Sequence, residues 1–522
     1  MVWQTEVEEI ERRRRVAMAL GGDEPVARQH AAGKLTIRER FERFLDPGSF
    51  RELGVLAAAA EYDDDGNLLR LTPSNSVLGT GVVDGRPLVV GGEDFTIRGG
   101  ASDGGGSASD GGGSAKMYYM EHLARQTRIP LVRLIEGTGG SVRANRRRHS
   151  GQAIGGAAIS PYVDLLSTVP VVSAAMGSVA GLPAARMAFA HFSIMLRETA
   201  VIFAGGPPVV EWALGVEVSK EELGGYEIHA FKSGLVDNLA EDEADCLQQI
   251  RRFLSYLPTN VWEPAPRSEP NDDPARRDEA LLSIIPRNRR RVYDPRKLIR
   301  HVVDLDSFFE LTQFYGRSLV TGLARVDGYP VGVVANNPGH VGGSMDGPAA
   351  DKMARFADLC DTFHLPVVSF EDEPGFMVGP AAEAEGVLRR GVRALAAVMQ
   401  TTVPWTNFIV RRAYGVAAGA HSNAGALRYA WPSGEWGSIP IEGGVAAAYR
   451  REIAAAPDPE QRRRELEARH EGDRNPFLRT EAFGLHDLID PRETRPISVD
   501  FVHQAQIVLR SSLGPKLRGV RP

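Results

Sequence analysis

The chain contains the same stretch of sequence twice, and this repeat limits the folds that it can adopt. Residues 83–90 read VDGRPLVV and residues 326–333 read VDGYPVGV, which places them 243 positions apart (326 − 83). A glycine pair follows each stretch at the same separation, at Gly99-Gly100 and at Gly342-Gly343. A long repeat of this kind indicates two copies of one structural unit. The fold must therefore be one that 522 residues can build twice.

A duplicated heptad explains the one break in the register of the repeat. After the glycine pairs the separation falls to 236, as between Lys116 and Lys352 (352 − 116), which is seven residues less. The segment Ala101–Ser114 is the heptad ASDGGGS written twice, and removing one copy restores the register. Doubling the length of a flexible surface loop costs only about 0.6 kcal/mol of closure entropy. We therefore interpret Ala108–Ser114 as a solvated second copy within a surface loop.

Strands and helices are expected to alternate in both halves. Apolar runs such as 131–135 are typical of buried strands. The spacing of Met117, Met120, Leu123 and Ala124 is typical of a helix with one apolar face. Alternation of this kind is characteristic of α/β layering, in which helices cover a sheet.

A strand in each half also leads into a G-x-x-A-G turn, at Gly177–Gly181 and at Gly415–Gly419. We predict an α/β protein of two tandem domains related by internal duplication. The first domain is expected at residues 1–262 and the second at 292–522. Residues 263–291, which are rich in Pro, Arg and Asp, are expected to form the connector between them.

Composition excludes several classes of protein. The net charge of −6 argues against binding to nucleic acid, which favours basic surfaces. The two cysteines, Cys246 and Cys360, are too few for a disulfide scaffold or a cysteine zinc site, and they suit a reducing compartment. No signal peptide and no run of about 18 apolar residues is visible. We expect a cytoplasmic protein that binds neither nucleic acid nor a membrane.

The familiar catalytic and metal-binding motifs are absent from the sequence. It contains no GxSxG, HExxH or GxxxxGK[ST] pattern, and no regular spacing of His and Asp that would hold a metal. Glycine-rich turns recur instead after apolar strands, and such turns leave main-chain N–H groups pointing toward a ligand. For any single turn a tight strand–helix connection is the simpler interpretation. Turns in matched sets favour anionic or oxyanionic ligands, and they lie at Gly99-Gly100, Gly139-Gly140, Gly177–Gly181, Gly205-Gly206, Gly342-Gly343 and Gly415–Gly419.

Several segments along the chain resemble one known family. They include AAGKLTIRERFERFLDPGSF ending at Phe50, GYPVGVVANNP at 328–338, DKMARFADLCDTFHLPVVSFEDEPGF at 351–376, and TVPWTNFIVRRAYG at 402–415. In order and content the segments are similar to the carboxyltransferase (β) subunit of the biotin-dependent acyl-CoA carboxylases, the propionyl-CoA and methylcrotonyl-CoA carboxylase family. The resemblance covers nearly the whole chain. It implies two crotonase-like (ClpP/crotonase) domains, which agrees with the internal repeat.

The resemblance also implies a reaction without a catalytic side chain. Carboxybiotin releases CO2 in the site, biotin takes the α-proton of the acyl-CoA, and the resulting enolate attacks the CO2. The protein must then supply two sets of N–H donors, one for the thioester oxygen and one for the ureido oxygen of biotin. An oriented donor of this kind lowers the activation free energy by roughly 2.7–4 kcal/mol. Confinement of the two reactants adds several kcal/mol more.

The partners implied by the resemblance are a separate biotin carboxylase and biotin carboxyl carrier (α) subunit, the acyl-CoA, and further copies of the chain. Relatives use a dimeric unit, commonly within a hexamer. The chain is not expected to carry its own biotin, because a carrier lysine lies between two methionines. Lys116 and Lys352 have only one flanking methionine each. No metal is expected in this subunit.

The family's functional positions are carried over residue by residue. The catalytic oxyanion donors fall on Gly181 and Leu182 in the first half and on Val416 and Ala417 in the second. The biotin-binding positions fall on Glu373, Pro374, Gly375, Phe376, Tyr414 and Gly415. The acyl-CoA-binding positions fall on Gly99, Gly100, Lys116, Gly139, Gly140, Arg143 and Gly419.

The chain departs from the family pattern at these same turns. Relatives carry glycine where Leu182 and Val416 stand, and Pro183 cannot donate a hydrogen bond. A side chain is compatible with donation only where the required φ is negative. Gly419 is small where relatives often have a larger or acidic residue, so we expect an acyl group other than acetyl or propionyl. Two alternatives remain open: the carboxyltransferase component of a biotin-dependent acyl-CoA decarboxylase, and a catalytically silent structural or regulatory relative.

Overall fold

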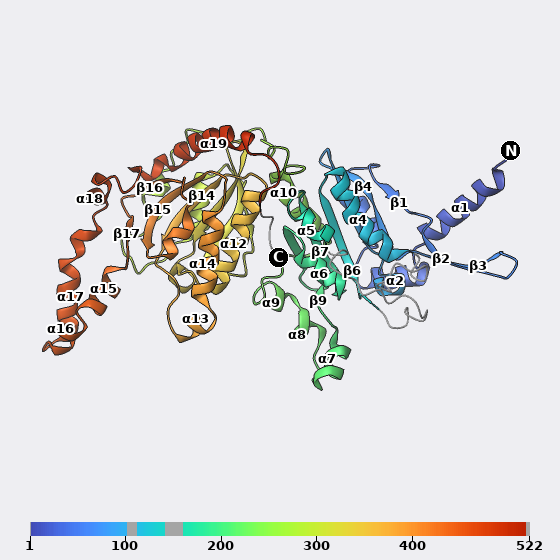
Figure 1. The fold of residues 1–522 in the computed structure, drawn as a ribbon, viewed down its shortest axis with the longest axis horizontal. Coiled ribbons are helices and arrows are strands. Elements are labelled where there is room, and N and C mark those ends of the chain that lie inside the picture. The colour runs from blue at the N-terminus through green and yellow to red at the C-terminus, as the bar shows by residue number, and fades with distance from the viewer. Residues whose placement is uncertain (1, 102–111, 141–159, 518–522) are drawn as a thin grey trace. The chain divides into compact units, whose positions relative to one another are not determined.

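The computed structural model describes residues 2–101, 112–140 and 160–517. The chain divides into two compact units, which are described one at a time (Figure 1). Unit 1 is Met1–Glu263 with Gly514–Pro522, and unit 2 is Pro264–Leu513. The segment 264–291, expected as a connector, thus lies in unit 2, where Leu281 is buried in the hydrophobic core. Gly514 returns to unit 1, where its N–H donates to the Val261 carbonyl.

A mixed β-sheet forms the centre of unit 1. Its strand order is β1-β4-β5-β6-β7-β8-β10, with β9 paired to β7. The pair β4–β5 is antiparallel, and β5, β6, β7 and β8 run parallel to one another. The strands are β1 Arg51–Leu53, β4 Ser76–Val83, β5 Arg86–Glu93, β6 Leu131–Gly137, β7 Val171–Ala180, β8 Phe192–Leu196, β9 Val201–Phe203 and β10 Asn238–Ala240. A separate hairpin pairs β2 Ala58–Tyr62 with β3 Leu68–Pro73.

The sheet of unit 2 follows the same path. Its order is β11-β12-β13-β14-β15-β16-β18, with β17 paired to β15. Here β12–β13 is the antiparallel hairpin, and β13 to β16 are parallel. The strands are β11 Phe309–Leu311, β12 Leu319–Val326, β13 Tyr329–Asn336, β14 Val367–Glu373, β15 Trp405–Tyr414, β16 Leu427–Ala430, β17 Glu435–Gly437 and β18 Asp487–Leu488. The prediction of two similar α/β units is confirmed.

Helices precede, connect and follow the strands in both units. In unit 1 they are α1 Gln4–Met18, α2 Asp23–Ala31, α3 Ile37–Phe44, η1 Arg98–Gly100, α4 Gly113–Thr127, α5 Ser160–Leu165, α6 Leu182–Ala188, α7 Pro207–Leu214, α8 Lys220–Gly224, α9 Tyr226–His229 and α10 Glu243–Tyr256. In unit 2 they are η4 Glu279–Leu282, α11 Pro295–Val302, η5 Val341–Gly343, α12 Gly347–Thr362, α13 Pro380–Ala384, α14 Val387–Met399, η6 Ala417–His421, α15 Ile441–Ala448, α16 Arg450–Ala455, α17 Pro459–Arg469, η7 Glu471–Arg474, α18 Pro476–Glu481, η8 Pro491–Glu493 and α19 Thr494–Ser511. The four apolar residues predicted for one face of α4 are all buried. No helix among the described residues combines the length and apolarity that crossing a bilayer requires.

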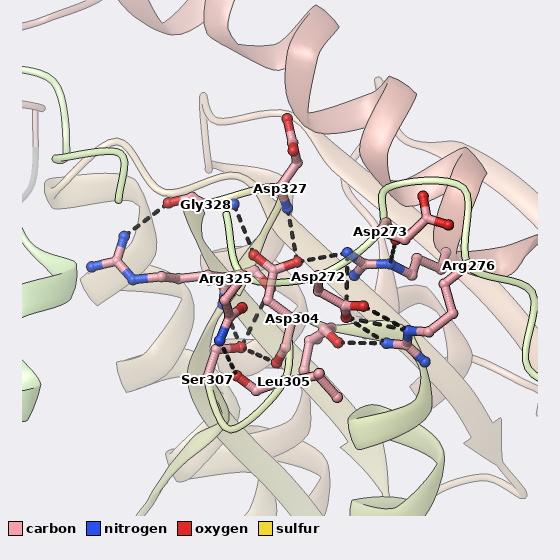
Figure 2. A network of polar contacts seen from close by, with 12 residues as sticks. Asp272, Asp273, Arg276, Asp304, Leu305, Ser307, Arg325, Asp327 and Gly328 are labelled. Atoms are coloured by element: carbon pink, nitrogen blue, oxygen red, sulfur yellow. Dashed lines mark hydrogen bonds and ion pairs between the residues drawn. The ribbon is translucent and has the colours of Figure 1, made fainter. Parts of the chain in front are cut away.

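An aspartate holds the turn between β12 and β13 in unit 2, within the polar network that Figure 2 shows. Asp327 has φ 49° and Gly328 has φ 75°, which is a turn geometry suited to Asp-Gly. Asp304 accepts the N–H of Asp327 at 3.0 Å and that of Gly328 at 2.7 Å. Arg495 of α19 lies 2.9 Å from the same carboxylate. The last helix of the unit is thereby fixed to the first hairpin.

Unit 1 repeats this arrangement. Asp84 and Gly85 have φ 49° and 77°, and Asp46 accepts both of their N–H groups, at 3.1 and 3.0 Å. Arg251 of α10 forms an ion pair with Asp84 at 2.8 Å. The duplication therefore extends from the strand order to individual hydrogen bonds. Equivalent strand ends of the two units can be compared directly.

Candidate functional site

The predicted turn after β7 is shorter than its sequence suggests. Ser178, Val179 and Ala180 continue β7 and pair with β9, so the prediction of a turn over the whole of Gly177–Gly181 is wrong. The chain turns at Gly181 alone, with φ 67° and ψ −130°. Leu182 follows as the first residue of α6, and its side chain is 37% exposed.

Main-chain N–H groups at the start of α6 are the candidate donors of unit 1. The N–H of Gly181 donates to the Phe203 carbonyl at 3.3 Å and is used within the fold. Leu182 lies in the first turn, where a helix provides no acceptor for the N–H, while Pro183 has no N–H to offer. Leu182 has helical backbone, so its side chain is compatible with this position. Of the two predicted donors in unit 1, Leu182 is the available one.

Unit 2 has the corresponding arrangement after β15. Gly415 has φ 65°, and its N–H donates to the Gly437 carbonyl at 3.0 Å. Val416 follows with φ −69° and ψ −32°, its side chain 59% exposed, and Ala417 opens η6. Because the φ of Val416 is negative, a side chain is accommodated without strain. The N–H groups of Val416 and Ala417 lie where the short helix begins and provides them with no acceptor.

Three of the predicted acyl-CoA-binding glycines lie at the ends of β6 and β7. A Cβ atom added to Gly139 would lie 2.6 Å from the Ala180 carbonyl oxygen, so only glycine fits against the end of β7. A Cβ atom at Gly100 would lie 2.5 Å from the carbonyl oxygen of Glu136. The Gly99 carbonyl accepts the N–H of Thr138. Gly99 and Gly100 therefore pack against the end of β6, next to Gly139. Arg143, also predicted to bind acyl-CoA, lies outside the described residues, as do residues 102–111 of the duplicated loop.

Lys116 of α4 is the predicted acyl-CoA-binding cation that the structure describes. Its Nζ donates to the Gly54 carbonyl at 3.2 Å. Burial lowers the pKa of Lys116 to about 8, against 10.5 for an ordinary lysine. Its repeat partner Lys352 is buried and donates to the carbonyls of Thr312, Tyr315 and Leu319, which is a structural role. The Lys116 ammonium group thus donates to one carbonyl in these contacts, whereas that of Lys352 donates to three.

Two of the residues predicted to bind biotin direct their side chains into the fold. The carboxylate of Glu373 is fully buried and accepts the N–H groups of Gly375, at 2.9 Å, and Met345, at 3.3 Å. The ring of Phe376 packs over α14, because a Cβ atom added to Gly391 would lie 2.2 Å from its Cε1. The loop 374–376 therefore presents mainly backbone at this site.

The remaining predicted positions in unit 2 also pack inward. Tyr414 is 4% exposed, and burial raises the pKa of its hydroxyl. A Cβ atom at Gly419 would lie 3.0 Å from Leu395 Cδ1 of α14, so a larger residue there requires Leu395 to move.

Buried charges beneath the turn of unit 1 were not predicted. Arg186, on α6, lies 3.6 Å from Glu121 and 3.9 Å from Glu93, and it donates to the Tyr162 hydroxyl at 2.9 Å. Burial opposes the charge of Arg186, but Glu121, Tyr162 and Glu93 together raise its pKa. These residues are far apart in the sequence, and no motif groups them. Only the fold brings them together.

A second buried group lies beneath the turn of unit 2. Ser369, Glu371 and Glu373 occupy alternate positions of β14 and are fully buried. His421, at the end of η6, is also fully buried and lies 3.5 Å from Glu373. From the sequence, His421 is interpreted as an ordinary packed or surface histidine, and Glu371 as the first residue of the segment 371–376 that resembles the loop beside biotin. A further signal for buried carboxylates is the charged run EDE inside an otherwise apolar strand. Within residues 2–101, 112–140 and 160–517, no three or more His, Cys, Asp or Glu are arranged to hold a metal.

Known proteins resemble this chain along most of its length. A family model described as carboxyl transferase domain matches residues 28–507. The propionyl-CoA carboxylase carboxyltransferase subunit of Haloferax mediterranei is 35% identical over 500 residues, covering 95% of this chain and 95% of that protein. Methylmalonyl-CoA decarboxylase subunit alpha of Veillonella parvula is 32% identical over 500 residues, again covering 95% of each. The crystal structure of transcarboxylase 12S, a hexamer with methylmalonyl-coenzyme A and methylmalonic acid bound, is 32% identical with a TM-score of 0.85, covering 99% of this chain and 98% of that one.

Proposed function

We propose a reaction for this chain on one established fact: it belongs to the carboxyl transferase family, as an acyl-CoA carboxyltransferase of the biotin-dependent type. The proposed reaction moves a carboxyl group from carboxybiotin to the α-carbon, or the vinylogous γ-carbon, of an acyl-CoA. One observation carries the proposal. Each duplicated unit has, after the equivalent strand, a positive-φ glycine followed by a short helix whose first N–H groups lack an intrahelical acceptor.

Unit 1 is proposed to hold the thioester. In the reaction the thioester oxygen gains negative charge as the α-carbon loses its proton, and an N–H donor that is already in place stabilises that charge. Leu182 is the proposed donor. Gly99, Gly100 and Gly139 would let the ligand approach the backbone closely. Lys116 is proposed to contact a phosphate of coenzyme A.

Unit 2 is proposed to hold biotin. The residues present fit its uncharged ureido group, because Val416 is exposed at the start of η6 and the loop 374–376 offers backbone. Biotin would supply the carboxyl group and the base when bound. The chain's own contribution is to bind the ureido oxygen with the N–H groups of Val416 and Ala417. Glu373 and Phe376, which face inward, are proposed to support this loop rather than to touch the ligand.

A partner must load the biotin, and we propose a biotin carboxylase and carrier subunit in this role. We also propose that the chain works as an assembly of copies, as the transcarboxylase 12S hexamer does. Copurification with a biotinylated subunit would support the first proposal. Sedimentation of the purified chain as a monomer would contradict the second.

A decarboxylase component is the second candidate function. The similarity to methylmalonyl-CoA decarboxylase subunit alpha favours it, since that protein matches over as much of the chain as the carboxylase subunit does. A catalytically silent relative is the third alternative. The available N–H groups at Leu182 and Val416 argue against silence, because neither side chain forces the backbone away from a donating geometry.

One experiment separates these alternatives. Purified chain is incubated with malonyl-CoA or methylmalonyl-CoA and free biotin, and loss of the carboxyl group is measured. Biotin-dependent decarboxylation identifies an enzyme, whereas no turnover with any acyl-CoA supports a silent relative. Assembly with an ATP-driven biotin carboxylase identifies the carboxylase direction. In a panel of acyl-CoA substrates we expect a branched or larger acyl group, and a clear preference for propionyl-CoA would contradict this expectation.

A further inference from the structure

Both short helices carry a basic residue that faces a buried carboxylate on a neighbouring strand. In unit 1, Arg186 near the end of α6 faces Glu93, the last residue of β5, at 3.9 Å. In unit 2, His421 at the end of η6 faces Glu373, the last residue of β14, at 3.5 Å. All four side chains are almost completely buried. In each unit the pair thus joins a strand end to the helix that begins at the candidate donor turn.

Glu373 is the more connected carboxylate. One of its oxygens accepts the N–H groups of Gly375 and Met345, at 2.9 and 3.3 Å. The other accepts the side-chain amide of Asn336 at 3.0 Å and faces His421 Nε2. A single buried group therefore contacts the end of β13, the loop 374–376 and η6. The last two are the segments proposed above to surround biotin.

His421 has charged neighbours on two elements. On β14, Glu373 lies opposite its Nε2, and Glu371 lies nearby on the same face of the strand. On β16, Arg428 lies 4.0 Å from Glu371. The buried face of α14, against which η6 packs, is uncharged, and the His421 Nδ1 lies 3.3 Å from the Ser369 hydroxyl.

His421 Nε2 and the Glu373 carboxylate face each other as buried polar groups. At 3.5 Å their separation is longer than an aligned hydrogen bond, and no hydrogen-bond acceptor meets Nε2 in the described part of the chain. An ionised carboxylate only accepts hydrogen bonds, so Nε2 is the atom of His421 that can donate toward Glu373. Removing one partner of a fully buried polar pair leaves the other polar group without its partner, which is costly in the interior. The easiest relief is movement of the loop 374–376, which is partly exposed, or of η6, which follows the exposed Val416.

We propose that Glu373 and His421 are positioning residues that hold the loop 374–376 and the start of η6 in one fixed relation. This inference rests on the proposed function, because it assigns these two segments to biotin. Neither side chain touches the ligand, since both are fully buried. Their effect is transmitted through the backbone of Gly375 and Ala417. Misplacement of a reacting group by about 1 Å lowers a rate on the order of 100-fold. The Glu373–His421 pair can therefore affect the reaction through the position of biotin, without contacting biotin.

The test compares two substitutions of His421 with a matched control. His421→Leu keeps similar bulk but cannot donate, and His421→Gln retains a donor that can face Glu373. Glu371→Gln is the control, because Glu371 lies on the same strand face and is equally buried but does not bind the loop. The first readout needs no ligand. Hydrogen–deuterium exchange of the intact protein is followed by mass spectrometry, in the peptides that cover 375–377 and 415–421.

We expect His421→Leu to accelerate exchange on the order of tenfold in both segments, with His421→Gln and Glu371→Gln close to the wild type. We also expect His421→Leu to raise the KM for free biotin on the order of tenfold and to leave the KM for acyl-CoA within about twofold. Exchange in His421→Leu equal to the wild type would overturn the proposal, as would an equal rise of both KM values. If the wild type transfers no carboxyl group at all, the proposed function fails. The exchange result still decides whether the Glu373–His421 pair holds the loop 374–376 and η6 in place.

Discussion

Replacement of Leu182 by proline removes one N–H group and changes little else. Leu182 is the first residue of α6, a position where proline's fixed φ suits a helix. Gly181 before it has φ 67° and ψ −130°, the mirror image of the extended backbone that a residue before proline prefers. Leu182 is already 37% exposed in the wild type, so replacing its side chain removes only a partly buried apolar surface. Leu182→Pro is therefore a deletion of one candidate oxyanion donor.

The expected loss of rate follows from the role proposed for that N–H. Removing one oxyanion donor costs roughly 2.7–4 kcal/mol, which corresponds to about 100- to 1000-fold in kcat. Leu182→Ala is the control, because it removes the same side chain but keeps the N–H. Its loss of stability, roughly 1–2 kcal/mol from partial burial, should be shared by the proline variant. Proline then recovers about 0.4–1 kcal/mol by restricting the unfolded chain.

The assay is biotin-dependent decarboxylation of malonyl-CoA or methylmalonyl-CoA by each variant, together with thermal unfolding. We expect Leu182→Pro to be at least as stable as Leu182→Ala and to turn over about 100-fold more slowly. Proline activity within about threefold of the alanine variant would refute the assignment of this N–H to the thioester oxygen. A proline variant that unfolds much earlier than the alanine variant would show that the first turn of α6 needs its N–H for folding.

Three further predictions concern the loop, a titrating lysine and a buried ion pair. Deleting Ala108–Ser114 should leave the unfolding temperature and kcat nearly unchanged, and a large rise in the KM for acyl-CoA would show that the second heptad binds substrate. Burial lowers the pKa of Lys116 to about 8, so its positive charge is lost as the pH rises through that value. The KM for acyl-CoA should therefore rise between about pH 7 and about pH 9 and be flat in Lys116→Gln, and equal profiles would exclude a phosphate contact. Arg40 is buried between Glu136 and Glu243, at 2.8 and 2.7 Å. Arg40→Leu should therefore lower the free energy of unfolding of unit 1, measured in urea, by about 3–5 kcal/mol. Loss of the exposed Arg43 should change it little.

The sequence by itself determined the two-unit architecture. A repeat whose offset changes only at the duplicated heptad fixes the same order of strands twice, and the two Asp-Gly turns at 84–85 and 327–328 adopt the same backbone. The buried face of α4 also follows from sequence, because apolar residues at helical spacing must share one face. These features depend on neighbours in the chain, which a sequence displays directly.

The tertiary structure alone decided which side chains face the site. The turn predicted over 177–181 became strand up to Ala180, because β9 supplies a pairing partner that the local sequence does not reveal. Glu373, the last residue of β14, and Phe376, in the loop that follows, turned inward because η6 lies against the first and α14 against the second. His421 meets Glu373 only after two helices, α13 and α14, and the parallel strand β15 have been added between them. In a parallel sheet the residues that share one strand end come from distant segments, so a local pattern cannot group them.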